Sequence, residues 1–127
     1  MSHKSELIEL HKRLSKTLDE EREAAKQKRH KKGYRTAREN LDDLVDKDSF
    51  VEYGQLAIAA QKSRREVEEL RTETAADGII TGFGKINGDI LQDSKALSAI
   101  IINDYSVLAG TQGYYHHKKL DRICETA

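Results

Sequence analysis

The sequence predicts an α/β (α+β) fold in which a helical N-terminal region precedes a small β-β-α unit. Residues 2–32 contain neither glycine nor proline and carry leucines at helical spacing. Short apolar runs flanked by glycine follow residue 76, as strands require. A glycine-containing loop, residues 108–113, then runs into a helical pattern. We therefore expect a helical region over residues 1–46 and the mixed unit over residues 47–127.

Composition argues against several kinds of partner. The 127 residues carry 22 Lys+Arg and 22 Asp+Glu, so no global charge recruits nucleic acid or an anionic membrane. No apolar run approaches the roughly 20 residues that a membrane-spanning helix needs. A single cysteine, Cys124, cannot form an internal disulfide, and no signal-like segment follows Met1. We expect a cytoplasmic or mitochondrial-matrix protein without nucleic-acid or membrane partners.

The N-terminal region predicts two helices. The first spans Ser2 to Lys32 and ends at Gly33, a residue type that commonly follows a helix. Its apolar stripe consists of Leu7, Leu10, Leu14 and Leu18. A second helix begins after Thr36, because Thr36 and Glu39 form a capping box in which each side chain accepts a hydrogen bond from the other residue's N–H.

The following residues predict short strands. Residues 49–53 alternate in polarity and end at a glycine. Residues 77–88 predict two strands, because Asn87-Gly88 is a strong signal for a tight hairpin turn, and the return strand would begin at Ile90. Residues 99–102 are uninterrupted and mostly β-branched, which predicts a strand buried on both faces.

The loop Leu108–Gly113 is the first candidate site. It presents backbone N–H groups at the start of a helix, where an anion, a phosphate or a developing oxyanion is stabilised. The alternative is that its glycines only shape a strand-to-helix turn. Neither the adjacent His116 and His117 nor Cys124 completes a metal site or a nucleophile with its base, so no metal is expected and Cys124 is interpreted as a buried or unreactive thiol.

A local basic run is the second candidate. Its cations are Lys26, Lys28, Arg29, Lys31, Lys32, Arg35 and Arg38. Such side chains near a helix end are natural phosphate ligands. The alternative is a solvated helix end whose charges complement the helix dipole.

Four segments in one order carry a family resemblance. They are Gly33–Leu44, with Thr-Ala-Arg-Glu at its centre, Asp46–Glu52, Asp77–Gly88 with Asp-Gly-Ile-Ile-Thr-Gly, and Asn103–Ile123 with Asp-Tyr-Ser-Val-Leu-Ala-Gly-Thr-Gln-Gly. Together they resemble the N-terminal part of the carboxyltransferase (beta) subunit of biotin-dependent acyl-CoA carboxylases of the propionyl-, methylcrotonoyl- and acetyl-CoA carboxylase type, a branch of the crotonase superfamily. Asp48, Ala109 and Thr111 depart from that pattern, which has Gly, Gly and Ser there.

The resemblance implies a partial crotonase-like domain that binds an acyl-CoA, stabilises its enolate and receives a carboxyl group from carboxybiotin. It implies that the backbone N–H groups of Gly110 and Thr111 are oxyanion donors. It also implies CoA contacts from Arg38, Arg35, Lys32 and Ala109. Biotin would be bound to a partner carrier, and none would be attached to this chain.

Expected partners are therefore the biotin carboxylase and biotin carrier subunits, the remainder of the carboxyltransferase, and further copies in a homo-oligomer. A chain of this length would be about the first half of one crotonase-like domain, so we expect it to be inactive alone. The alternative function, from another class, is a non-catalytic assembly module whose N-terminal helix packs on a partner.

Overall fold

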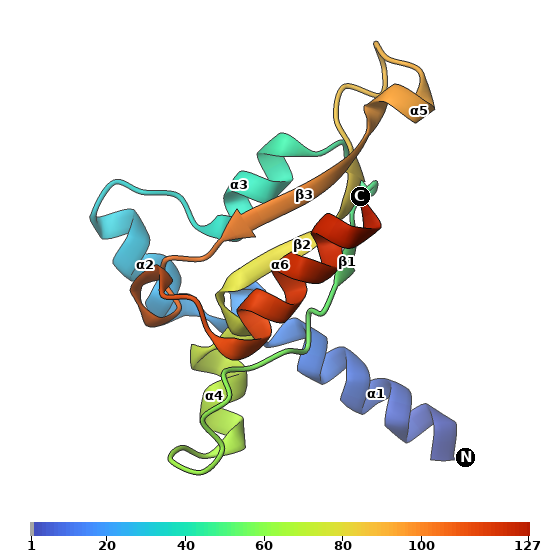
Figure 1. Cartoon of the computed structure of the whole chain (residues 1–127). Coiled ribbons are helices and arrows are strands. Elements are labelled where there is room, and N and C mark those ends of the chain that lie inside the picture. The colour runs from blue at the N-terminus through green and yellow to red at the C-terminus, as the bar shows by residue number, and fades with distance from the viewer. Residues whose placement is uncertain (1) are drawn as a thin grey trace.

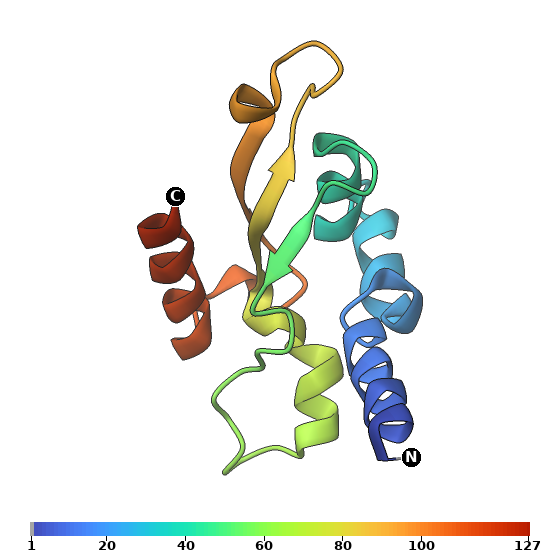
Figure 2. The same ribbon diagram turned by 90° about the vertical axis from the view of Figure 1, so that its right-hand side faces the viewer.

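The computed structural model describes residues 2–127, with the backbone alone for Ser2. At its centre lies an antiparallel three-stranded sheet in the order β1 (Val51–Tyr53), β2 (Ile79–Lys85), β3 (Leu97–Asn103). Helix α6 (Tyr114–Thr126) covers one face and helix α3 (Ala37–Leu44) the other, as Figure 2 shows. This mixed arrangement confirms the predicted α/β class.

The predicted capping box starts helix α3. The Thr36 hydroxyl accepts from the Glu39 N–H at 3.0 Å, and the Glu39 carboxylate accepts from the Thr36 N–H at 2.8 Å. The helix then buries Ala37 and Leu41 against the sheet, where they join Ile80 and Ile100 in the core. The alternation of β2 therefore separates this core from the opposite face, which carries Ile79 and Thr81 beneath α6.

The glycine at position 82 is required by close packing of two strands. A Cβ at Gly82 would lie 2.1 Å from the Val51 carbonyl oxygen and 2.7 Å from the Phe50 ring. No side chain fits at such distances, so the Thr-Gly segment lets β1 approach β2.

The single long N-terminal helix was a wrong prediction. The chain instead forms α1 (Ser2–Ser15), a 3₁₀ turn η1 (Asp19–Glu21) and α2 (Glu23–Lys31). The break lies at Thr17, whose hydroxyl donates back to the Leu14 carbonyl at 2.7 Å. Gln55 donates to the same hydroxyl at 2.7 Å, and Leu18 is extended. Contacts from a distant segment therefore override local helix propensity here.

Helix α4 (Val67–Glu73) forms within a charged segment of the chain. It is tied to the N-terminal helices at two points. The Lys16 ammonium pairs with Glu68, and Arg22 donates to the Thr72 carbonyl at 2.8 Å. A 3₁₀ turn, η2 (Ala75–Gly78), then leads directly into β2.

The tight hairpin at Asn87-Gly88 was also predicted wrongly. The chain does turn there, with Asn87 at φ +56°, but the Gly88 N–H donates to the Asp46 carboxylate at 2.8 Å. No return strand begins at Ile90. An excursion through the short helix α5 (Asp93–Ala96) follows, closed by an Ile86 N–H to Ala96 carbonyl bond of 2.9 Å, and the return strand is β3.

Strand β3 is buried on one face only, contrary to the prediction. Ile100 is 4% exposed, whereas Leu97 and Ile101 are 56% and 43% exposed. Within residues 2–127, β3 is an edge strand, and α6 covers only part of the face on which Leu97 and Ile101 lie. None of the helices in this part of the chain is long and apolar enough to cross a bilayer.

Candidate functional site

A cavity of about 960 Å³ lies between α2 and the loop that follows β3. Its wall combines cations of α2 with the loop residues Leu108 and Ala109. Those cations are Lys28, Arg29 and Lys32 (the last just beyond the helix end), and none of them forms an ion pair within residues 2–127. The cavity also has acidic residues in its wall, Glu21, Glu23 and Glu73, of which Glu23 pairs with Lys26 and Glu73 with Arg65. The unpaired positive charge therefore collects at the α2 side.

Two tyrosines lie beside Arg29 in this wall. Its guanidinium carbon is 4.8 Å from the centre of the Tyr34 ring and 5.7 Å from that of Tyr105, both within cation–π range. The Arg29 Nε also donates to the Arg35 carbonyl at 3.2 Å. The cluster gives the cavity flat aromatic surfaces next to its cations.

The loop is folded by its own hydrogen bonds. Leu108, Ala109 and Gly110 are all left-handed, with φ of +47°, +53° and +79°, and form the turn η3 (Leu108–Gly110). The Gly110 N–H donates to the Val107 carbonyl at 3.0 Å, and the Thr111 N–H to the Leu108 carbonyl at 3.2 Å. Both N–H groups that the resemblance implies as oxyanion donors are thus engaged inside the loop. Two consecutive non-glycine residues at positive φ mark a backbone held by its surroundings.

A largely buried ion pair anchors the start of this loop. Arg22 contacts Asp104 with Nη1 and Oδ2 3.2 Å apart, and the two side chains are 7% and 15% exposed. The other Asp104 oxygen accepts from the Ser106 N–H at 2.9 Å and from its hydroxyl. The sequence alone did not identify Arg22, because Asp104 lies 82 positions further along the chain and only the fold brings the two residues together.

The structure brings together two of the predicted CoA-contacting residues. Lys32 and Ala109 both line the cavity. Arg38 instead pairs with Glu52 through both terminal guanidinium nitrogens, Nη1 and Nη2, in a pair largely shielded from solvent. Arg35 donates to the Asp43 carboxylate at 3.1 Å and to a main-chain carbonyl, and neither arginine lines the cavity.

The N-terminus of α6 is capped by an acid of the chain itself. The Asp77 carboxylate accepts the His116 N–H at 2.9 Å, and a Cβ at Gly113 would lie 2.8 Å from it. Burial raises the pKa of Asp77, while the N–H groups of His116 and Tyr115 oppose that rise. Asp77 itself is left-handed at φ +48° and 2% exposed. The helix terminus that the sequence predicted as an anion site is therefore filled by an internal carboxylate.

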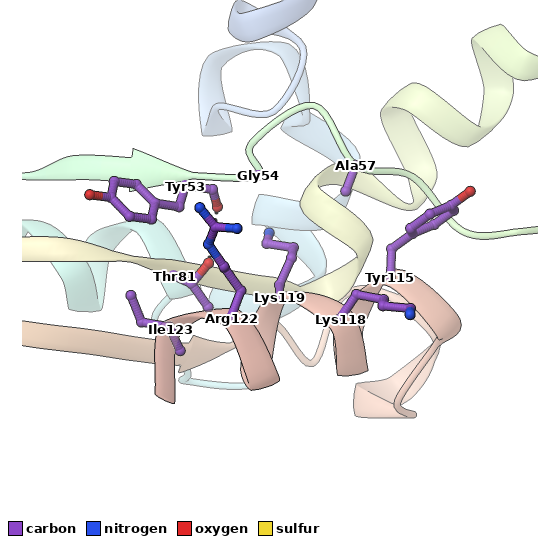
Figure 3. A pocket seen from close by; sticks show the side chains of 9 residues that line it. All are labelled: Tyr53, Gly54, Ala57, Thr81, Tyr115, Lys118, Lys119, Arg122 and Ile123. Atoms are coloured by element: carbon purple, nitrogen blue, oxygen red, sulfur yellow. Dashed lines mark hydrogen bonds between the residues drawn. The ribbon is translucent and has the colours of Figure 1, made fainter. Parts of the chain in front are cut away.

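Lys119 completes the contact between α6 and η2. Its ammonium donates to the Ala76 carbonyl at 2.8 Å and to the Ile79 carbonyl, and burial lowers its pKa to about 8, an effect partly offset by Glu52. Lys119 also borders a second cavity of about 220 Å³ between α6 and the end of β1, drawn in Figure 3. In that view Tyr53 and Arg122 lie at one end and Tyr115 and Lys118 at the other.

The adjacent histidines differ, as expected for neighbours on a helix. His116 is 1% exposed and its Nδ1 lies 3.1 Å from the Asp77 carbonyl, whereas His117 is exposed. Cys124 is exposed rather than buried. No group of three or more metal-ligating side chains occurs among the described residues.

Fold and site together describe a mixed α/β domain with a basic cavity beside a glycine loop, and similarity to known proteins places it in the crotonase-like carboxyltransferase class. The chain belongs to the carboxyl transferase domain family, whose model matches residues 28–127. The beta5 subunit of the Mycobacterium tuberculosis biotin-dependent acetyl-/propionyl-coenzyme A carboxylase is 36% identical to this chain over 122 residues. The match covers 95% of this chain and 20% of that protein. The propionyl-CoA carboxylase beta chain of Roseobacter denitrificans is 31% identical over 98 residues, or 77% of this chain and 17% of that one.

Solved structures agree with this assignment. A single-chain, multi-domain long-chain acyl-CoA carboxylase matches 96% of this chain at 51% identity and a TM-score of 0.93, using 12% of its own length. Transcarboxylase 12S, solved as a hexamer with methylmalonyl-CoA and methylmalonic acid bound, matches 81% of this chain at 28% identity and a TM-score of 0.61, using 18% of its length. The chain therefore spans about a fifth or less of each of these relatives.

Proposed function

We propose that this chain is the part of a carboxyltransferase domain that binds the CoA moiety of an acyl-CoA, and that it contributes to carboxyl transfer from carboxybiotin. The observation that carries this proposal is the cavity in which Lys28, Arg29 and Lys32 face Ala109 of the glycine loop. CoA presents a 3′-phosphate and a diphosphate, which bind ammonium and guanidinium groups through strong charged hydrogen bonds. Tyr34 and Tyr105 offer surfaces on which an adenine can stack.

Relatives support the substrate class. Proteins similar to this chain include acyl-CoA carboxylase beta subunits and a transcarboxylase with an acyl-CoA bound. Lys32 and Ala109 retain their assigned role in this proposal. Arg38 and Arg35 do not carry it, because Arg38 is committed to Glu52 and Arg35 lies outside the cavity. The non-catalytic assembly module is not favoured by this family membership.

Enolate stabilisation is assigned to the N–H groups of Gly110 and Thr111. Paired backbone donors stabilise an oxyanion without changing their own protonation state. Because both N–H groups donate to loop carbonyls, the assignment requires the turn Leu108–Gly110 to open when the thioester binds. Carboxybiotin enters as a substrate on a partner carrier, and no residue of this chain is assigned to it. Carboxyl transfer itself is proposed for a complete carboxyltransferase that contains this segment. We expect the 127-residue chain alone to give no carboxylated product.

The test is binding of CoA to the 127-residue chain by isothermal titration calorimetry. Lys28→Ala combined with Lys32→Ala should weaken binding by roughly tenfold or more, since each charged hydrogen bond contributes about 1.5–3 kcal/mol. The control is Lys47→Ala combined with Lys62→Ala, which removes the same charge from exposed positions outside the cavity. Equal losses in the two double variants would show a non-specific charge effect and overturn the proposal.

A further inference from the structure

Helix α1 carries an apolar stripe that the rest of the chain leaves largely uncovered. Leu7 and Leu10 are 51% and 40% exposed, and Leu14 is half-buried where the helix meets the body of the molecule. Figure 1 shows α1 projecting from that body toward the N-terminus. A helix of 14 residues is marginal in water on its own. Cover for this stripe would therefore stabilise the helix itself.

The spacing of the stripe suits a second helix. Leu7, Leu10 and Leu14 follow the alternating three- and four-residue spacing of paired helices. Glu6 and Arg13 flank the stripe on the same side, one turn before Leu10 and one turn after it. The flank is thus acidic toward the N-terminus and basic toward the C-terminus of α1.

We propose that α1 is a self-association surface whose occupant is the α1 helix of a second copy of this chain, packed antiparallel. In that orientation Leu7 meets the partner's Leu10, and Glu6 meets the partner's Arg13. The two-fold symmetry repeats both contacts. Antiparallel packing also places the two folded bodies at opposite ends of the helix pair, because each body joins α1 at its C-terminal end.

Parallel packing has neither advantage. Glu6 would then face the partner's His11, Arg13 would face Leu18 beyond the helix end, and both bodies would crowd at one end. Within one copy, Glu6 lies 3.5 Å from His3 and Arg13 lies 3.0 Å from Glu9. Exposed pairs of this kind contribute little, so exchanging them for contacts to a partner costs little.

The first experiment measures association by sedimentation equilibrium over a concentration series. The unaltered chain should show a reversible monomer–dimer equilibrium. Leu10→Asp should weaken the dimer by at least about tenfold, because it places a charge in the apolar contact. Ile8→Asp is the matched control: Ile8 is 61% exposed but points about 100° away from Leu7, and the dimer should persist. Equal effects of the two substitutions, or a chain that stays monomeric throughout, would overturn the proposal.

Charge reversal and cross-linking test the orientation. Glu6→Arg and Arg13→Glu should each weaken the dimer, and the two together should restore it. In a Cys124→Ser background, mixing Glu6→Cys with Arg13→Cys chains under mild oxidation should yield mainly the mixed 6–13 disulfide. Dominant 6–6 and 13–13 products, or no rescue by the double reversal, would contradict antiparallel packing. Circular dichroism of each variant checks that it stays folded. The Ile101→Lys substitution distinguishes the α1–α1 contact from association through the exposed edge of β3.

Discussion

Single side chains hold the two loops of this domain in unusual backbone conformations. Asp77 and the two residues beside it are left-handed, as are Leu108, Ala109 and Gly110 in the second loop. Asp77 is held by the first turn of α6, and the second loop by Asp104 and Arg22. Strain of this kind persists only where neighbouring groups enforce it. The loops are therefore positioned by a few largely buried polar contacts rather than by apolar packing alone.

The pH dependence of stability tests the buried amine of Lys119. Its pKa is lowered from 10.5 to about 8, so between those values the unfolded chain still binds a proton that the folded chain has lost. The unfolding free energy should then rise with pH relative to a variant without the group. Urea unfolding of the unaltered chain and of Lys119→Met, at about pH 7 and about pH 9.5, should show their difference shifting in favour of the unaltered chain. A constant difference would mean that the amine titrates normally.

Alanine substitutions at two glycines with nearly the same φ distinguish backbone strain from a side-chain contact. Gly33 at φ +77° has nothing within 4 Å of an added Cβ, whereas at Gly110, φ +79°, that atom would lie 3.2 Å from the Tyr105 ring. Alanine at either position should cost about 1–2 kcal/mol in denaturant unfolding. Gly110→Ala alone should also weaken CoA binding, because it displaces Tyr105 in the cavity. Unchanged CoA affinity in Gly110→Ala would remove the loop from the binding site.

Among the helices and strands, the sequence predicted those elements whose formation depends on neighbouring residues. The Thr36–Glu39 capping box, the strand near residues 49–53 and the final helix all depend on neighbouring residues, and all formed. The break at Thr17 and the excursion after Asn87 depend on Gln55 and Asp46, which lie about 40 positions away along the chain. No local signal such as glycine or proline marks the break.

The candidate site likewise combines features that are visible in the local sequence with an arrangement that only the fold reveals. The basic run and the glycine loop were both visible in the sequence. Of the four residues expected to meet around CoA, Arg38, Arg35, Lys32 and Ala109, only Lys32 and Ala109 line the cavity. Arg38 was misleading because its partner Glu52 lies in β1, and a sequence does not reveal which cations are already paired. Asp77 was visible as part of a motif, yet only the fold shows that it caps α6.

Substitutions at Asp77 test the capping of α6. Asparagine tolerates the left-handed conformation and keeps one oxygen acceptor without burying a charge, so Asp77→Asn should cost less than about 1 kcal/mol. Asp77→Ala loses the acceptor and should cost about 2 kcal/mol. Hydrogen exchange should show the loss concentrated in the first turn of α6. Similar costs for the two variants would indicate that the carboxylate charge, rather than the cap, is essential.

The part of the sheet that α6 leaves uncovered is a second exposed apolar surface besides α1. Leu97 and Ile101 are exposed on edge strand β3, a geometry that favours intermolecular pairing. Changing both to lysine should raise the concentration at which light scattering detects aggregates, with little loss of stability because both side chains already contact solvent. If the double substitution leaves aggregation unchanged, a different surface of the protein mediates it.

CoA is proposed to bind between α2 and the glycine loop. The most direct measurement is a ¹H–¹⁵N NMR titration of the 127-residue chain with CoA. We expect the largest shift changes on Lys28–Tyr34 and Tyr105–Gly110, which border that cavity. Shift changes confined to α6 and the end of β1, around the smaller cavity of Figure 3, or no changes at all, would contradict it.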